Sequence, residues 1–498
     1  MMIGNVKAAL KLLSENNNAG ILPLTPETLN LLDEKHPQAE AKQDDMMLEG
    51  PEIFIGEFEY NNIDGDLIQK SALHTKGAAG PSNLDADGWR RILTSNMYGK
   101  HNSDLCNAIA TMARTLCIKR YCCTDGSLEG LFACRLIPLD KAPGLRPIGI
   151  GEILRRIIGK SVMAVMKTNI IDSVGNLQLC AGQKSGCEAA VHSMSKIFKE
   201  ESTDGILLVD ASNAFNSLNR QVMLHNIRIT CPLIANFIIN SYNQPPRLFI
   251  TGGKEILSSE GTTQGDPTSM AAYALSTLPL LSAITTIGVK HAAFADDLSG
   301  GGDLLSLKRW WNNITKYGPK IGFYPYQKKS WLIVKPDKLD DAIKIFADTN
   351  INITSEGKRH LGAVIGSIKY KENYVKHLVL DWCTQLDLLS NIANFYPQAA
   401  YCAYTSGFKH KFNYAIRTIP NIKHLLQPIE EIIRHKFLPS ICDNRICSDD
   451  DRLLLSLPVR LGVLVLTTSH QLLTLNLNSL TKSRKYYNKI LITKQPSQ

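Results

Sequence analysis

Two adjacent acidic residues, Asp296 and Asp297, follow an apolar run that starts at His291 and precede glycines that end at Gly302. This pattern predicts a short strand that ends in a glycine-rich turn, with both carboxylates at the tip of a hairpin. Neighbouring carboxylates both stay ionised near neutral pH only when a cation lies between them, and Mg²⁺ prefers oxygen ligands. An isolated acidic pair after a strand is nevertheless more often an exposed turn than a metal site.

Asp210 supplies the third acidic residue that such a site needs. Residues 206–209 are apolar and β-prone and end at Asp210, which predicts a second strand with a carboxylate at its end. Three acids on adjacent strands hold two Mg²⁺ ions, with Mn²⁺ as an alternative, and activate an attacking hydroxyl in phosphoryl transfer. Between the two strands lies a polar, glycine-rich loop, residues 260–268, which contains Gln264 and Gly265.

In this order, the three segments resemble successive palm motifs of the reverse transcriptases, in particular those of eukaryotic retroelements that lack long terminal repeats or resemble them. The likeness covers residues 75–370 well and the flanks less well. It implies that Asp210, Asp296 and Asp297 bind the metal ions. The commonest form of the last motif begins with Tyr, whereas this chain has Phe294. Because a hydroxyl near the primer end is missing, we expect activity to be tuned rather than lost.

The resemblance extends upstream to a fingers hairpin in residues 134–148. Lys141 and Arg146 would meet the incoming triphosphate there, with Gln264 and Gly265 as further nucleotide-binding residues. Cations have a physical reason at this place, because a triphosphate brings negative charge into a site already crowded with carboxylates. As isolated residues, either cation would more often be solvated surface, so the assignment depends on the motif. Residues 143 and 144, Pro-Gly, predict the turn between the strands.

Downstream segments complete the likeness. Residues 322–334 resemble the next palm motif, whose Lys donates a proton to departing pyrophosphate; Lys329 is the candidate and Lys328 the competing one. A Lys pair before an apolar strand is otherwise a solubilising edge. Residues 358–365 match the Leu-Gly turn called the primer grip. We expect His360, Leu361 and Gly362 at its apex.

Phe215 distinguishes between the possible substrates. Ribonucleotide polymerases of similar architecture place a second acid near this position to hold the 2′-hydroxyl, whereas a bulky ring excludes it. The resemblance therefore implies an RNA-directed DNA polymerase, the polymerase part of a retrotransposon, with an RNA template, a DNA or RNA primer and deoxynucleoside triphosphates as partners. The alternatives are an RNA-dependent RNA polymerase and a non-catalytic palm-fold relic that binds nucleic acid. No sequence pattern of a ribonuclease H, an endonuclease, a retroviral-type protease or a zinc knuckle is present.

The resemblance implies an α+β fold of the right-hand polymerase type, with fingers, a palm in which an antiparallel sheet packs on helices, and a helical thumb-like C-terminal region. The expected parts are a peripheral N-terminal extension and acidic linker (1–50), fingers and the start of the palm (51–200), the palm with the catalytic motifs (201–370), and a helical thumb-like region with an uncertain tail (371–498). In the tail, Val463 replaces the second glycine of the family's closing element.

Several smaller patterns refine this picture. Thr25 followed by proline predicts a capped helix, and the acidic trio that starts at Asp449 predicts the N-terminus of another. Residues 154–167 form a basic amphipathic pattern in which Arg155, Arg156 and Lys160 face either template phosphate or solvent.

Composition agrees with a polymerase without naming one. The 498 residues carry a net charge of +9, which favours a polyanionic partner. The twelve cysteines lack zinc-type spacing and predict buried, reduced thiols. With no secretory pattern at Met1, a cytoplasmic or nuclear location fits. Residues 267–289 are uncharged and long enough to cross a bilayer, but their prolines, hydroxyls and position between two motifs favour a buried helix and no membrane contact.

Overall fold

The central sheet carries two of the sequence motifs on neighbouring strands. The computed structural model describes residues 20–41, 44–95, 99–121, 128–141 and 144–457. Helices and small mixed sheets alternate along this part of the chain, which is compatible with the expected α+β class. The central sheet has five strands in the order β11 (Asn352–Thr354), β10 (Trp331–Val334), β3 (Gly205–Val209), β8 (Asp297–Gly302) and β7 (Val289–Phe294).

The sheet is mixed rather than purely antiparallel, which corrects the prediction. The three pairings β10–β3, β3–β8 and β8–β7 are antiparallel, but β11 lies parallel to β10 at the edge. The parallel pairing is possible because helix α14 (Leu339–Ile345) connects the two strands as a crossover.

The glycine run is a strand, whereas the sequence predicted a turn. Gly300, Gly301 and Gly302 belong to β8 and pair with β3 and β7. A Cβ added to Gly300 would lie 2.8 Å from the Trp310 ring, and one added to Gly301 would lie 2.6 Å from the side chain of Ile197. Glycine is therefore required here because helices approach the strand closely, not because the chain turns.

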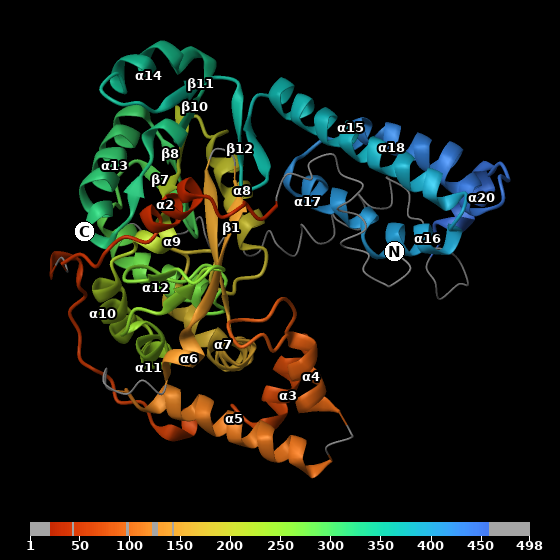
Figure 1. Ribbon diagram of the computed structural model, residues 1–498. Helices are drawn as coiled ribbons and strands as arrows, with labels where there is room; N and C mark the ends of the chain where they lie inside the picture. The colour runs from red at the N-terminus through yellow and green to blue at the C-terminus, as the bar shows by residue number, and fades with distance from the viewer. Residues whose placement is uncertain (1–19, 42–43, 96–98, 122–127, 142–143, 458–498) are drawn as a thin grey trace.

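Helices cover both faces of this sheet (Figure 1). Ile206 and Leu208 of β3 pack against α8 (Gly186–Ile197), whereas Leu207 and Val209 point into the main core with α12 (Ser269–Ala283) and α13 (Leu304–Tyr317). Alternate residues of a strand face opposite sides, so burial of both faces explains why β3 is wholly apolar. The buried α12 confirms the prediction for the uncharged segment. No helix in the described ranges is long and apolar enough to cross a membrane.

A second sheet and a group of helices lie on one side of the central sheet. The strands are ordered β2 (Leu145–Gly151), β1 (Cys134–Asp140), β5 (Arg247–Phe249) and β6 (Glu255–Leu257). The helices are α3 (Gly65–His74), α4 (Ala86–Thr94), α5 (Lys100–Ile118), α6 (Glu129–Phe132), α7 (Ile153–Val174), α10 (Arg220–Thr230) and α11 (Pro232–Tyr242). In Figure 1, α3, α4 and α5 form the orange lobe at the bottom, joined to the sheet by α7.

Residues 20–41 and 44–50 lie along the other elements instead of standing apart from them. Helix α2 (Pro26–Glu34) begins after the predicted cap, Thr25, whose hydroxyl accepts from the backbone of Thr28. The backbone of Leu22 donates to Pro138 of β1 over 2.9 Å. Further along, the side chain of Asn213 donates to the carbonyl of Lys35 over 2.9 Å. This part of the predicted peripheral extension is therefore bonded to residues next to Asp210.

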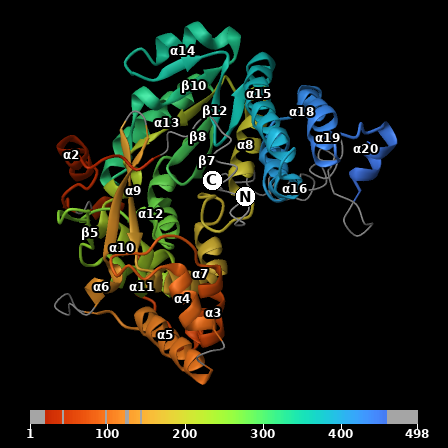
Figure 2. The ribbon, with the colours of Figure 1, turned by 45° about the vertical axis from the view of Figure 1, so that its right-hand side comes forward.

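The described residues after 367 are mainly helical, and their hydrophobic core also contains Val191 of α8, Ala363 and Val364. Figures 1 and 2 show these helices as a separate group beside β12 and α8. They are α15 (Ile368–Ala393), α16 (Pro397–Ser406), α17 (Lys411–Thr418), α18 (Gln427–Ile432), a π-helical turn (Ile433–Phe437), α19 (Leu438–Ile441) and α20 (Asp449–Leu455). Ser448 caps α20 in a capping box with Asp451, which confirms the prediction for the acidic trio. The predicted closing element, from residue 458 onward, lies outside the described residues.

The cysteine prediction is confirmed with one exception for the cysteines that the structure describes, whereas Cys122 and Cys123 lie outside the described residues. All ten cysteines in the described part of the chain are free thiols, and nine of them are buried or half-buried. Cys402 is exposed.

Candidate active site

The acidic pair lies at the tip of a tight hairpin. Strands β7 and β8 pair from Val289–Gly302 to Phe294–Asp297, so only Ala295 and Asp296 form the turn. Ala295 has a φ of +55°, whereas Asp296 does not have a positive φ. A positive φ at the first central residue alone is typical of a type II′ turn, where glycine is preferred. The predicted position of both carboxylates at a hairpin tip is therefore confirmed.

Asp210 lies opposite this tip. Strand β3 pairs with β8 up to Val209–Leu298, and the next step of the same register places Asp210 beside Asp297. Side chains directly opposite each other on antiparallel strands have Cβ atoms about 5 Å apart. The backbone of Asp210 is held by two contacts: its carbonyl accepts from Tyr326 over 2.7 Å, and its N–H donates to the Ser330 hydroxyl over 3.3 Å.

The three carboxylates affect one another electrostatically. Burial raises the pKa of Asp210 and of Asp296 above the ordinary aspartate value. Asp297 keeps an accessible surface, yet desolvation by the protein around it, together with the charges of Asp296 and Asp210, raises its pKa to about 6. Like charges that lie close together disfavour the ionised form of each carboxyl group. The raised pKa of Asp297 therefore indicates that the negative charges of the three acids are not fully compensated here.

Three cations face the carboxylates. The positive charge of Lys329 opposes the rise that burial causes in the pKa of Asp210. The charges of Lys141 and Arg146 oppose the rise in the pKa of Asp296 in the same way. Arg146 is exposed on β2, and Lys141 follows the end of β1. Among the two competing lysines, the amine of Lys329 lies over the Tyr326 ring at 5.1 Å and acts on Asp210. The structure thus brings together six of the predicted site residues from four segments of the chain.

The donor chemistry of the three acids fits a hard divalent cation. All three offer carboxylate oxygens, the ligands that Mg²⁺ prefers. The raised pKa of Asp297 reflects desolvation first and then repulsion by Asp296 and Asp210, and a cation would relieve that repulsion. Within the described ranges, no group of three or more His, Cys, Asp or Glu side chains is close enough to hold a metal ion.

Phe215 lies beside this site on a rigid support. It belongs to the short helix α9 (Ala214–Ser217), and its half-buried ring stacks on Tyr273 with 4.5 Å between ring centroids. Tyr273 is fully buried in α12, and desolvation together with the charge of Asp296 raises its pKa. The predicted position of Phe215 after the strand is thus observed, and its ring is fixed from behind.

Gln264 and Gly265 connect the central sheet to the β1–β2 hairpin. The carbonyl of Gln264 accepts from the backbone of Gly149 over 2.9 Å. Gly265 has a φ of +111°, and a Cβ there would lie 2.6 Å from the carbonyl oxygen of Gly149. Only glycine permits this close approach of the two backbones. The loop therefore positions the hairpin that carries Lys141 and Arg146.

The predicted primer-grip turn is a second tight hairpin. Strands β12 (Gly357–His360) and β13 (Ala363–Gly366) are joined by Leu361 and Gly362 alone, with φ angles of +48° and +79°. His360 is not at the apex, which corrects the prediction. It ends β12, is 6% exposed, and desolvation lowers its pKa to about 4. A buried neutral imidazole of this kind supports packing and does not face a nucleic acid.

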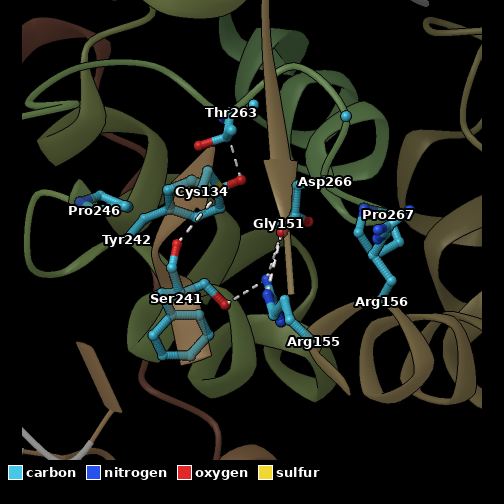
Figure 3. A pocket seen from close by; sticks show the side chains of 13 residues that line it. Cys134, Gly151, Arg155, Arg156, Ser241, Tyr242, Pro246, Thr263, Asp266 and Pro267 are labelled. Atoms are coloured by element: carbon cyan, nitrogen blue, oxygen red, sulfur yellow. Dashed lines mark hydrogen bonds and ion pairs between the residues drawn. The ribbon is translucent and has the colours of Figure 1, made fainter. Parts of the chain in front are cut away.

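The basic helix makes internal contacts instead of presenting its cations to a template. Arg155 is 2% exposed, forms a salt bridge of 3.0 Å with Asp266 and donates to the Ser241 hydroxyl, beside a small pocket (Figure 3). The guanidinium of Arg156 donates to the carbonyl of Lys76, and the amine of Lys160 donates to that of His74. The motif loop and this helix are 111 residues apart in sequence, so no local pattern could have predicted the Arg155 contact.

Comparison with other proteins adds no identification. No protein-family model matches this chain, and a search of the curated proteins found no matching sequence. The interpretation of the site depends on its geometry and on the sequence motifs.

Proposed function

We propose that this chain is a template-directed nucleotidyltransferase, and specifically an RNA-directed DNA polymerase of a retroelement. The observation that carries this proposal is the placement of Asp210, Asp296 and Asp297 on adjacent strands, opposed by Lys141, Arg146 and Lys329. An acidic centre surrounded by cations matches the needs of a reaction between a metal-bound triphosphate and a primer hydroxyl.

In this proposal, each residue has a distinct role. When bound, two Mg²⁺ ions would activate the primer hydroxyl and stabilise the leaving oxygen. Asp210, Asp296 and Asp297 would hold these ions. Lys141 and Arg146 would bind the triphosphate, because their charges oppose those of the acids. Lys329 would donate a proton to the departing pyrophosphate, since its amine lies near Asp210.

The parts of the fold would correspond to those of a right-hand polymerase. The sheet of β1 and β2 with α3 to α7 would be the fingers, the five-stranded sheet would be the palm, and α15 to α20 would be the thumb. The hairpin of Leu361 and Gly362 lies between palm and thumb, which suits a contact with the primer.

Phe215 favours deoxynucleotides over ribonucleotides in this proposal. Its ring stacks on Tyr273 and so cannot easily withdraw when a 2′-hydroxyl approaches. An RNA-dependent RNA polymerase, the second candidate, would place an acid near this position to bind the 2′-hydroxyl. A non-catalytic relic is the third candidate, and the presence of all three acids gives no support to it.

Primer extension tests the function directly. Purified protein is incubated with a primed RNA template, Mg²⁺ and either deoxynucleotides or ribonucleotides. We expect elongation with deoxynucleotides. Elongation with ribonucleotides alone would favour the RNA polymerase, and no elongation together with retained template binding would favour the relic.

The Phe215→Val variant tests the choice of sugar. We expect the ratio of kcat/KM for deoxynucleotides and ribonucleotides to fall, because removal of the ring relieves a steric rejection. Phe346→Val is the matched control, since Phe346 is a fully buried ring at the end of α14. A folded Phe215 variant with an unchanged ratio would mean that the ring is only a core aromatic.

A further inference from the structure

The turn that carries the acidic pair contains a strained residue. Ala295 has a φ of +55°, in the left-handed region where a side chain crowds the backbone. Neither Ala295 nor Asp296 is a glycine, which a turn of this kind normally has at its first central position. Ala295 is also buried. Something outside the turn must therefore hold this backbone conformation.

Gln178 makes the contacts that do so. Its side-chain oxygen accepts from the Ala295 N–H over 2.8 Å, and its side-chain nitrogen donates to the Ala295 carbonyl over 3.1 Å. One amide thus satisfies both backbone groups of the strained residue. Next to it, the backbone of Leu179 donates to the carbonyl of Ala293 over 2.9 Å, and Gln178 forms an isolated parallel bridge with Ala293. The segment lies along β7 as far as the acidic turn.

The Gln178 side chain is itself held in place. Gln178 is 1% exposed, and its nitrogen also reaches the hydroxyl of Thr277 on α12 over 3.3 Å. The amide therefore has partners on both sides and one favourable orientation. A buried amide with fixed partners can hold the backbone to which it is bonded in one place, whereas an exposed and mobile amide cannot.

We propose that Gln178 is a positioning residue for the acidic turn: its amide holds the Ala295 backbone in the left-handed conformation that directs Asp296 and Asp297 toward Asp210. This proposal rests on the proposed function and extends it by one residue. Gln178 does not touch the reacting atoms. It acts through Ala295, whose carbonyl carbon is bonded directly to Asp296.

A simpler explanation is that Gln178 is only a satisfied buried amide. Both explanations predict that its loss destabilises the fold. They differ at Ala295, because a Gly adopts a positive φ without help. If Gln178 compensates for the strain, Ala295→Gly makes the turn less dependent on it. If Gln178 is merely buried, Gln178→Met destabilises the fold equally with alanine and with glycine at position 295.

The test is a double-mutant cycle of Gln178→Met and Ala295→Gly with two readouts. Methionine keeps the length of the side chain and removes the two hydrogen bonds to Ala295 together with the contact to Thr277. The first readout is the dissociation constant of Mn²⁺, used as a probe of the acidic site and measured without nucleotide by water-proton relaxation. We expect Gln178→Met to weaken binding about fivefold, in line with the loss of a hydrogen bond. The double variant should recover most of this affinity.

The second readout is urea unfolding of the same four proteins without metal. We expect Gln178→Met to raise the unfolding equilibrium constant, and to raise it by a factor at least about threefold smaller in the Ala295→Gly background. Gln385→Met is the matched control, because Gln385 is 2% exposed and lies in α15. The control should destabilise the fold and leave Mn²⁺ affinity unchanged.

The outcomes separate this proposal from the proposed function. If the native chain binds no Mn²⁺ and extends no primer, the function fails, and the unfolding cycle still decides whether Gln178 holds the turn. Independent effects of the two substitutions in unfolding would overturn the proposal. So would equal weakening of Mn²⁺ binding in Gln178→Met and in the double variant. Rescue in both readouts supports it.

Discussion

Two hairpins in this structure stabilise a strained two-residue turn in different ways. One turn consists of Ala295 and Asp296, and the other consists of Leu361 and Gly362. Each turns through two residues, and each places a residue other than glycine at a positive φ. The first turn is held by an amide from within the same core, Gln178. The second is held by hydroxyls from the C-terminal helices. One turn therefore belongs to the sheet, and the other connects two parts of the molecule.

The contacts of the second turn show this connection. The Tyr414 hydroxyl of α17 donates to the carbonyl of Leu361, and the Tyr374 hydroxyl of α15 donates to that of Gly362 over 3.2 Å. The Cys187 thiol of α8 lies 3.1 Å from the Tyr414 hydroxyl. The second turn therefore has hydrogen-bond partners on the C-terminal helices, whereas the partner of the acidic turn, Gln178, lies next to β7.

The largest expected effect concerns the acidic turn. Asp296→Asn should abolish polymerisation and leave template binding largely intact, because it removes charge for the metal without changing the cations. The loss corresponds to several kcal/mol of transition-state stabilisation, or a reduction in kcat of at least about a thousandfold. Asp340→Asn, an exposed acid on α14, is the control and should retain full activity. Extension by the Asp296 variant at the native rate would show that this turn is not the metal site.

A second prediction uses the raised pKa of Asp297, about 6. A carboxylate whose pKa is raised on folding adds stability below its unfolded pKa, and this stability is lost as pH rises through about 6. A divalent ion should reverse the loss, since it competes with the proton. Stabilisation by Mg²⁺, measured as a shift in Tm, should therefore be small at pH 5 and larger at pH 7.5.

The control for the pH experiment is Asp297→Asn, in which this dependence on pH should become smaller, because only the raised pKa values of Asp210 and Asp296 remain. The groups that act on the Asp297 charge are Asp296, Asp210 and Lys141. A Mg²⁺ effect on Tm that is equal at both pH values would contradict the coupling of proton and metal at this turn.

A third prediction separates the two turns. Tyr414→Phe removes the hydroxyl that donates to the carbonyl of Leu361, leaving the weaker contact from the Cys187 thiol at 3.5 Å, and should lower the unfolding free energy by about 1 kcal/mol. Because the affected turn is the proposed primer grip, products made in one binding event should become shorter while the KM for nucleotides stays the same. Tyr404→Phe is the matched control, because that buried hydroxyl has no hydrogen-bond partner in the described part of the chain. Equal processivity in both variants would contradict the assignment.

The smallest expected effect is at Gly362. A Cβ at its φ of +79° would be strained and would lie 3.2 Å from the Tyr414 ring, so Gly362→Ala should cost roughly 1 kcal/mol of unfolding free energy. Gly130→Ala is the control: it lies in α6 with nothing near its Cβ position and should be neutral or stabilising. If both alanine variants are equally stable, a side chain at position 362 causes no strain, and the expectation for the second turn is wrong.

Local patterns in the sequence were sufficient for individual elements. Asp210 follows an apolar run, and that run is β3; Asp296 and Asp297 lie at a hairpin tip. Thr25 and Ser448 cap the helices that their side chains predict. These features depend on residues within a few positions of one another, where strand alternation and capping chemistry act directly.

Tertiary contacts decided what local patterns could not. The glycines of β8 resemble a turn until Trp310 and Ile197 are seen to approach them. Arg155 resembles a template contact until Asp266 and Ser241 surround it.

The type and spacing of acids, glycines and cations are local properties, so the residues that could carry the chemistry were recognisable from the sequence alone. Which of these residues meet in space depends on the folded chain. Gln178 and Ala295 are 117 residues apart, and no local propensity connects an amide to a strained turn at that distance. The contact exists because the backbone cost of a left-handed alanine is offset by two hydrogen bonds that only the folded chain can form.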